Sequence, residues 1–112
     1  MAGTIKRTVG PVALTTTYTT NVYNQTSALI YDVVRQITVN NKTGSSATFR
    51  LYLGLTGANT AGTEIFFDKS VASFDTFNWY GTLRVASADF LVGGASANTT
   101  LTITIMGDQY VV

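Results

Sequence analysis

Few residues of this 112-residue chain could act chemically on a substrate. The sequence has no histidine and no cysteine, which removes the commonest general base, the commonest transition-metal ligands and the thiol nucleophile. The carboxylates are Asp32, Glu64, Asp68, Asp75, Asp89 and Asp108. Most stand near expected turns, where aspartate is favoured because it hydrogen-bonds to the backbone. Asp68 and Asp75 could share a calcium ion across a hairpin, but use in turns is the simpler interpretation. We expect no catalytic, metal-binding or cofactor-binding residue, and a protein that is not an enzyme.

The aromatic residues Phe74, Phe77, Trp79 and Tyr80 lie close together in the sequence. Such a cluster could form a platform that stacks on sugar rings. It could also supply core and subunit-interface anchors, the usual use of aromatic side chains, and this is the interpretation that we favour. Binding of single-stranded nucleic acid would require a basic groove beside the aromatics, and the positive residues are scattered along the chain.

The charge of the chain points to neither nucleic acid nor membrane. The net charge is +1, and charged residues make up 12% of the sequence, against a usual share of roughly 25%. Only Lys6 and Arg7 are adjacent positive residues; they fit a solvated arm or a contact with an acidic partner surface. The start of the sequence has no apolar signal region, and no apolar run approaches the roughly 20 residues of a membrane span. We expect a soluble protein made in a cytoplasm.

The hydrophobic pattern repeats every two residues, which is typical of half-buried strands. Leu101, Ile103 and Ile105 alternate with threonines, and threonine is β-branched and fits a pleated surface. The pattern predicts an all-β protein: one small antiparallel β-sandwich, jelly-roll-like, with about 7–9 short strands between turns. We expect this domain to span residues 13–112, preceded by an extended N-terminal arm at residues 1–12.

Several local features are predicted within that sandwich. Residues 33–40 and 46–54 are expected to form a hairpin, and Arg35 is expected at the sheet rim or at a bulge near residues 33–34 because it falls on the apolar face. The uncharged run 15–23 is expected to be an edge strand that is paired, either by a strand of its own chain or by a neighbouring molecule. Residues 71–80 are read as one run, residues 54–64 and 93–94 as loops, and residues 107–108 as a break in the last long strand.

Two stretches resemble small β-sandwich structural proteins of tailed bacteriophages. They read VVRQITVNNKTGSSATFRLYLG, at residues 33–54, and TLRVASADFLVGGASANTTLTITIMG, at residues 82–107. The resemblance spans roughly residues 17–108. It implies a non-enzymatic virion protein made in the host cytoplasm, most simply a head decoration or minor capsid protein, with a tail- or fibre-associated module that binds host glycan as the alternative.

The resemblance also implies partners. It predicts a homo-oligomer, commonly a trimer, that contacts the major capsid protein, and it implies no cofactor, no nucleic acid and no membrane. The residues expected at these contacts are Lys6, Arg7, Tyr18, Phe77, Trp79 and Tyr80.

Overall fold

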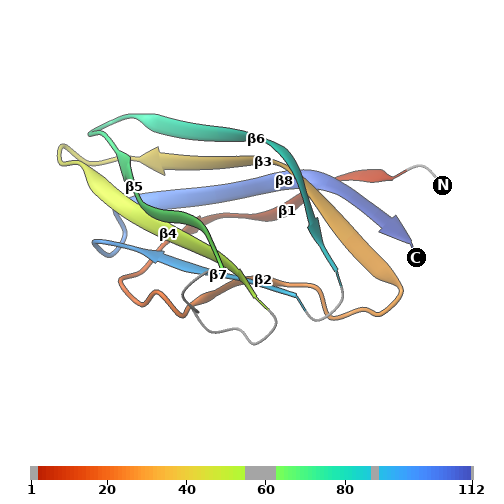
Figure 1. Ribbon diagram of the computed structural model, residues 1–112. Coiled ribbons are helices and arrows are strands. Elements are labelled where there is room, and N and C mark those ends of the chain that lie inside the picture. Colours follow the sequence, from red (N-terminus) through yellow and green to blue (C-terminus); the bar gives the residue numbers. More distant parts are fainter. Residues whose placement is uncertain (1–2, 55–62, 87–88, 112) are drawn as a thin grey trace.

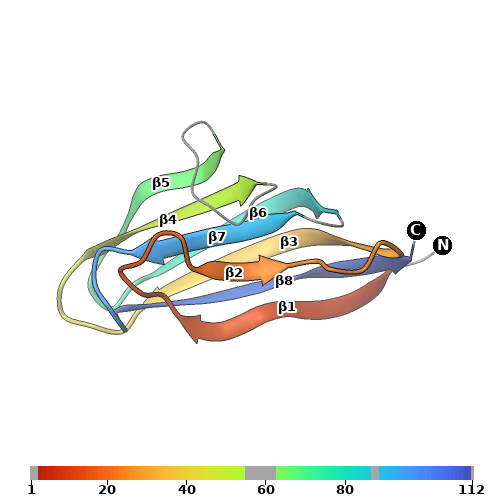
Figure 2. The same cartoon turned by 90° about the horizontal axis from the view of Figure 1, so that it is seen from below.

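The computed structural model describes residues 3–54, 63–86 and 89–111, and within these ranges the protein is all-β. Two antiparallel four-stranded sheets pack face to face (Figures 1 and 2). Sheet A has the order β1 (Thr4–Ala13), β8 (Leu101–Val111), β3 (Ile30–Asn41) and β6 (Thr76–Val85). Sheet B has the order β2 (Asn21–Asn24), β7 (Phe90–Ala95), β4 (Ala47–Gly54) and β5 (Glu64–Val71). The described residues include no helix long and apolar enough to cross a membrane.

The connectivity is that of a jelly roll, as the sequence pattern predicts. Successive strands lie in opposite sheets at every step along the chain except from β4 to β5, which pair within sheet B. The expected hairpin of residues 33–40 with 46–54 is therefore wrong, because β3 lies in sheet A and β4 in sheet B. The polar turn between them carries the chain from sheet A to sheet B. The residues of the turn do not indicate whether the two strands pair or lie in different sheets.

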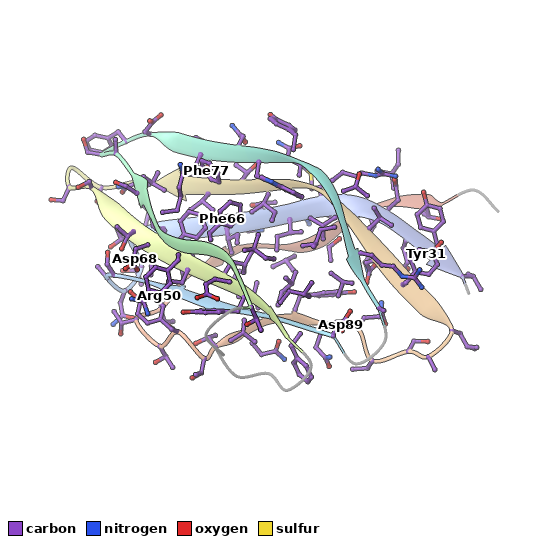
Figure 3. All side chains as sticks on the ribbon, viewed as in Figure 1. Tyr31, Arg50, Phe66, Asp68, Phe77 and Asp89 are labelled. Atoms are coloured by element: carbon purple, nitrogen blue, oxygen red, sulfur yellow. The ribbon has the colours of Figure 1, made fainter. Side chains whose placement is uncertain are left out.

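The core lies between the two sheets and is built from the alternating apolar positions. Ile37, Phe49, Leu51, Ile103 and Ile105 are fully buried, and burying a side chain of this size stabilises the fold by roughly 1.5–3 kcal/mol. Aromatic rings join the layers: the centroid of Phe49 lies 5.4 Å from Phe66 and 5.9 Å from Phe77. Figure 3 labels Phe66 and Phe77, which come from β5 and β6.

The N-terminal segment is a strand and not a free arm. Residues 4–13 form β1, which pairs with β8 along its length at one edge of sheet A. The register shifts between Arg7 and Val9 and again between Val9 and Val12, and Gly10 has a φ of 74°. These irregularities interrupt the alternation that marks a strand. Gly10 and Pro11 belong to a bulged edge strand, a place where both residue types are tolerated.

Arg35 occupies a bulge, one of the two placements that we expected. Both ladders of β3 shift register between Val34 and Gln36. The Arg35 side chain is exposed, and its Nε lies 3.1 Å from Oδ2 of Asp108. The bulge therefore lets Val34 and Ile37 both face the core while the charge between them stays outside.

Two glycine segments that we expected to interrupt strands are inside them. Gly93 and Gly94 are buried in β7, and Gly107 is buried in β8. A Cβ at Gly107 would clash with the backbone carbonyl of Val33, and one at Gly93 with that of Arg50. These glycines allow close approach of neighbouring strands, a second use of glycine beside turns.

Two other runs are divided differently from our expectation. Of residues 15–23, only the end is strand; β2 pairs with β7, and the carbonyls of Thr15 and Thr20 accept hydrogen bonds from the amides of Ala95 and Gly93. The run is therefore paired, by strands of its own chain. The run 71–80 is cut by a turn, because β5 ends at Val71 and β6 begins at Thr76. Most of the loop expected at residues 54–64 lies outside the described residues.

Candidate interaction surface

The outward-facing surface of sheet A is broad, polar and uncharged over much of its area. Cross-strand neighbours in the ladders share a face, so the partners of outward residues on β3 also point outward. We call the outward residues of β3 and their partners on β6 and β8 the outer panel: Gln36, Thr38, Asn40, Thr76, Asn78, Tyr80, Thr102, Thr104 and Met106. None is charged. Most of their neighbours along each strand are apolar residues that face the core, so the alternation that builds the core also builds the panel.

Hydrogen bonds between side chains order part of the outer panel. The Thr38 hydroxyl donates to Oδ1 of Asn78 at 2.8 Å, and Gln36 Nε2 donates to the Thr38 hydroxyl at 3.2 Å. Threonine has few rotamers, because two heavy atoms branch at Cβ. This part of the panel is therefore ordered before any partner arrives. A protein that covers the panel would need to desolvate hydroxyls and amides but no ion.

One row of the ladder joins two of the residues expected at contacts. Arg7 pairs with Met106, Met106 with Gln36, and Gln36 with Tyr80, so this row crosses all four strands of sheet A. Arg7 and Tyr80 are exposed at opposite ends of the row. Tyr80 leaves 69% of its surface exposed, one of the largest fractions among the apolar side chains. The structure thus places Arg7 and Tyr80 at opposite borders of the outer panel, with Tyr80 inside the panel and Arg7 next to it on β1.

The remaining expected contact residues on β1 and β6 do not face the outer panel. Phe77 and Trp79 point inward from β6 and pack against the core, half-buried. The Nζ of Lys6 lies 5.7 Å from the centre of the Tyr23 ring, a cation–π contact between the two sheets. Because Trp79 and Tyr80 project from opposite faces of β6, they do not form one surface on which a sugar ring could stack.

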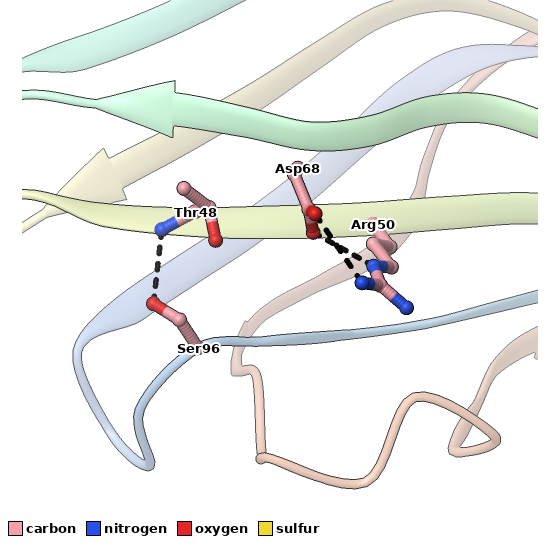
Figure 4. A network of polar contacts seen from close by, with 4 residues as sticks. All are labelled: Thr48, Arg50, Asp68 and Ser96. Carbon is pink, nitrogen blue, oxygen red and sulfur yellow. Dashed lines mark hydrogen bonds and ion pairs between the residues drawn. The ribbon is translucent and has the colours of Figure 1, made fainter.

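Tyr18, the last of the expected contact residues, belongs to a separate cluster on sheet B. The Arg50 guanidinium lies between the rings of Tyr18, at 4.3 Å, and Phe67, at 4.2 Å. Its Nε and Nη2 bind the two carboxylate oxygens of Asp68 at 2.7 and 3.2 Å. Figure 4 shows this ion pair near the bond from the Thr48 amide to the Ser96 hydroxyl.

The ion pair on sheet B changes the titration of both partners. The hydrogen bond from Arg50 lowers the pKa of Asp68, and the same bond raises the pKa of Arg50. Arg50 on β4 therefore contacts Tyr18, Phe67 and Asp68 at the same time. These contacts form a clasp, which holds the segment before β2 against β4 and β5. The sequence-based idea of a calcium site at Asp68 and Asp75 does not fit this geometry, since Asp75 caps the amide of Thr76 at 2.8 Å.

A second aromatic stack crosses the outer face of sheet A next to the panel. The rings of Tyr31 and Tyr110 lie parallel, 5.1 Å apart, and the Arg84 guanidinium lies 4.2 Å from the Tyr31 ring. A Cβ on Gly3, the residue before β1, would come within 2.7 Å of the Tyr110 ring. The stack therefore joins β8, β3 and β6 through Tyr110, Tyr31 and Arg84. It also fixes Arg84, the charged residue of β6.

A buried carboxylate is the functional-looking group that sequence reasoning missed. Asp32 on β3 is fully buried. Its Oδ2 accepts hydrogen bonds from the Tyr23 hydroxyl at 2.6 Å and from Gln25 Nε2 at 2.7 Å, and its Oδ1 accepts one from Gln109 Nε2 at 3.2 Å. Burial and the hydrogen bond to Asp32 raise the pKa of Tyr23. The signal in the sequence was an aspartate inside an apolar strand pattern, where turn chemistry does not apply.

This carboxylate has a structural role in the described part of the chain. Its three hydrogen-bond donors come from β2, from the loop after β2 and from β8, so Asp32 ties both sheets together at one end. Among the described residues, no group of three or more side chains is arranged to hold a metal ion, and no pocket is found.

Comparison of the chain with protein-family models and with curated proteins finds no match. The chain is a small jelly-roll domain with an uncharged outer panel on sheet A, ordered in part by side-chain hydrogen bonds, and an ionic clasp on sheet B.

Proposed function

We propose that the protein is a non-enzymatic structural protein of a tailed-phage virion, a capsid decoration or minor capsid protein that binds the head surface and stabilises the shell. The observation that supports this proposal is the outer panel. A polar, uncharged and partly ordered sheet face is suited to being covered by another protein, because covering it desolvates no ion. The sequence resemblance to small phage virion proteins agrees with it, and so does the jelly roll, a fold common in viral capsids, although fold alone does not define function.

The stabilising mechanism would be linkage. A protein that binds the assembled shell but not its separated subunits shifts the assembly equilibrium toward the shell. The outer panel supplies the covered area, and Arg7 and Tyr80 at its two borders supply a charge and an exposed aromatic ring as anchors. Arginine and tyrosine are enriched among the residues that dominate binding energy at interfaces. The partners proposed are the major capsid protein and further copies of this chain.

The position in the virion can be tested directly. Virions are separated into DNA-filled heads and isolated tails, and an antibody against this protein is used to find which fraction contains it. We expect the protein in the fraction of DNA-filled heads. Recovery with the tails alone overturns the capsid role and supports the tail- or fibre-associated alternative, and absence from both overturns the virion role.

The outer panel can be tested with a pair of glutamate variants. Thr104→Glu places a charge in the middle of the panel, whereas Ser70→Glu places one at an exposed position of sheet B. Each purified variant is mixed with heads that lack the protein and is sedimented with them. We expect Thr104→Glu to reduce co-sedimentation at least tenfold, because an ion would have to be desolvated, and Ser70→Glu to bind as the unchanged protein does. Equal binding by both variants would exclude the panel as the contact.

A further inference from the structure

The two sheets have four edge strands, and three of them carry features that prevent pairing with another chain. β1 has Lys6, Arg7, Pro11 and two register shifts. β2 has only four residues, and β5 has Asp68, Lys69 and two register shifts. Charges, prolines, bulges and short length are the usual protections of an edge strand.

The fourth edge, β6, lacks most of these protections. It is ten residues long, from Thr76 to Val85, and it contains no lysine and no proline. Its one charged residue is Arg84, and its ladder with β3 has a single register shift. Among the described residues its only hydrogen-bonded neighbour is β3. In an antiparallel ladder, alternate residues turn both the N–H and the C=O away from the neighbouring strand. β6 therefore presents a row of backbone donors and acceptors at the upper border of sheet A in Figure 1.

We infer that β6 is the docking edge for a second copy of this chain, paired antiparallel with its own β6 around a two-fold axis at Tyr80. A two-fold contact uses the same strand twice, so it must be self-complementary. The less exposed positions of β6 are the odd ones on both sides of Gly81, namely Phe77, Trp79, Leu83 and Val85, whereas Gly81 itself is exposed. Pairing around Tyr80 keeps these faces in register, because residues an equal number of positions before and after it then lie opposite each other.

Charge complementarity selects this register. It places Arg84 of one copy opposite Thr76 and next to Asp75 of the other, so opposite charges are neighbours at both ends of the new ladder. It places the exposed Tyr80 ring next to its own copy, and aromatic cross-strand pairs stabilise sheets. Trp79 comes to lie opposite Gly81, and the indole already packs over Gly81 within one chain, where a Cβ would come within 2.6 Å of the ring.

The inferred dimer would join two copies of sheet A into one continuous sheet. Both outer panels would then face the same side, which doubles the surface offered to a capsid. This last consequence rests on the proposed function, but the dimer itself does not. It also replaces the trimer implied by the sequence resemblance, since one edge paired with itself closes at two copies.

The mass of the protein in solution and a disulfide test this inference. The chain contains no cysteine, so Tyr80→Cys introduces a single thiol. In the two-fold ladder the two residues at position 80 are directly opposite, about 4.5–5.5 Å apart, which a disulfide can span. The control is Thr104→Cys on β8, which the dimer keeps five strand spacings, about 24 Å, from its copy. Each variant is oxidised and its mass is measured on a non-reducing gel.

We expect sedimentation equilibrium of the unchanged protein to give twice the 12.0 kDa of one chain, and oxidation to link the Tyr80→Cys variant but not the Thr104→Cys variant. A second variant, Tyr80→Lys, places two like charges opposite each other and should give monomers, while Met106→Lys in the same row should remain dimeric; circular dichroism checks that both are folded. A monomer, a trimer or a disulfide through residue 104 alone would overturn the inference. None of these results bears on whether the protein is found with heads.

Discussion

Replacement of Asp32 by asparagine tests whether the buried carboxylate organises this end of the sandwich. The substitution keeps the size of the side chain but turns one acceptor oxygen into an amide with two N–H donors. In one orientation of the amide, the new donors face Tyr23 and Gln25; in the other, they face Gln109. A donor therefore meets a donor in either case.

The expected cost follows from these contacts. A hydrogen bond to a carboxylate contributes roughly 1.5–3 kcal/mol, and a buried donor left without an acceptor costs about 1–3 kcal/mol. Since Asp32 is fully buried, water cannot replace the lost partner without rearrangement. We expect Asp32→Asn to lower the free energy of unfolding by about 2–4 kcal/mol. For a chain of this length that is a fall of roughly 8–16 °C in Tm.

Thermal and urea unfolding, followed by the fluorescence of Trp79 and by circular dichroism, measure this effect. Asp108→Asn is the matched control, because it makes the same chemical change in the partly exposed ion pair with Arg35. Its Tm should change far less. If Asp32→Asn unfolds at the temperature of the unchanged protein, the view that Asp32 ties the two sheets together is refuted.

Three further results are expected. Gly107→Ala should lower the free energy of unfolding by about 3 kcal/mol, the upper end of the usual cost of overpacking, because the new Cβ would meet backbone. Gly44→Ala, whose Cβ would have ordinary contacts, should unfold as the unchanged protein does, and urea unfolding compares the two variants. The pKa of Tyr23 is raised in the folded state, so its contribution to the free energy of unfolding is complete below its unfolded pKa of 10.0 and is lost as the pH rises above that value. Unfolding measured between pH 8 and 12 should show this loss of stability, and the Tyr23→Phe variant should lack it. Arg50→Lys cannot stack or bind two oxygens in the same way, so the amides near Tyr18 should exchange hydrogen faster, and unchanged exchange would contradict the clasp.

Some features of the candidate surface could be predicted from the sequence, and others could not. Arg7 and Tyr80 were expected at contacts, and both border the outer panel. Phe77 and Trp79 were expected there too, but they pack against the core, because the phase of β6 assigns odd positions to the inside. Which face of a strand with aromatic residues on both sides is buried depends on the opposing sheet, and the strand alone does not contain that information.

The sequence by itself determined the class of fold. Side chains on a strand point alternately to opposite faces, so the repeat at Leu101, Ile103 and Ile105 identifies both a strand and its buried side, and threonine between them identifies the exposed side. This rule is local and needs no knowledge of the partner strand. It also limited Arg35 to the sheet rim or a bulge, since a charge on the apolar face requires one of the two, and the structure has the bulge.

Only the tertiary structure decided which strands become neighbours. β1 is a strand because β8 supplies its hydrogen bonds, and β4 joins sheet B and not β3 because the chain crosses between layers. Gly107 lies inside a strand because the backbone of β3 approaches it closely, and Asp32 is satisfied by donors from both sheets. These outcomes depend on groups far apart in the sequence, and bulges shift the alternation that local patterns rely on.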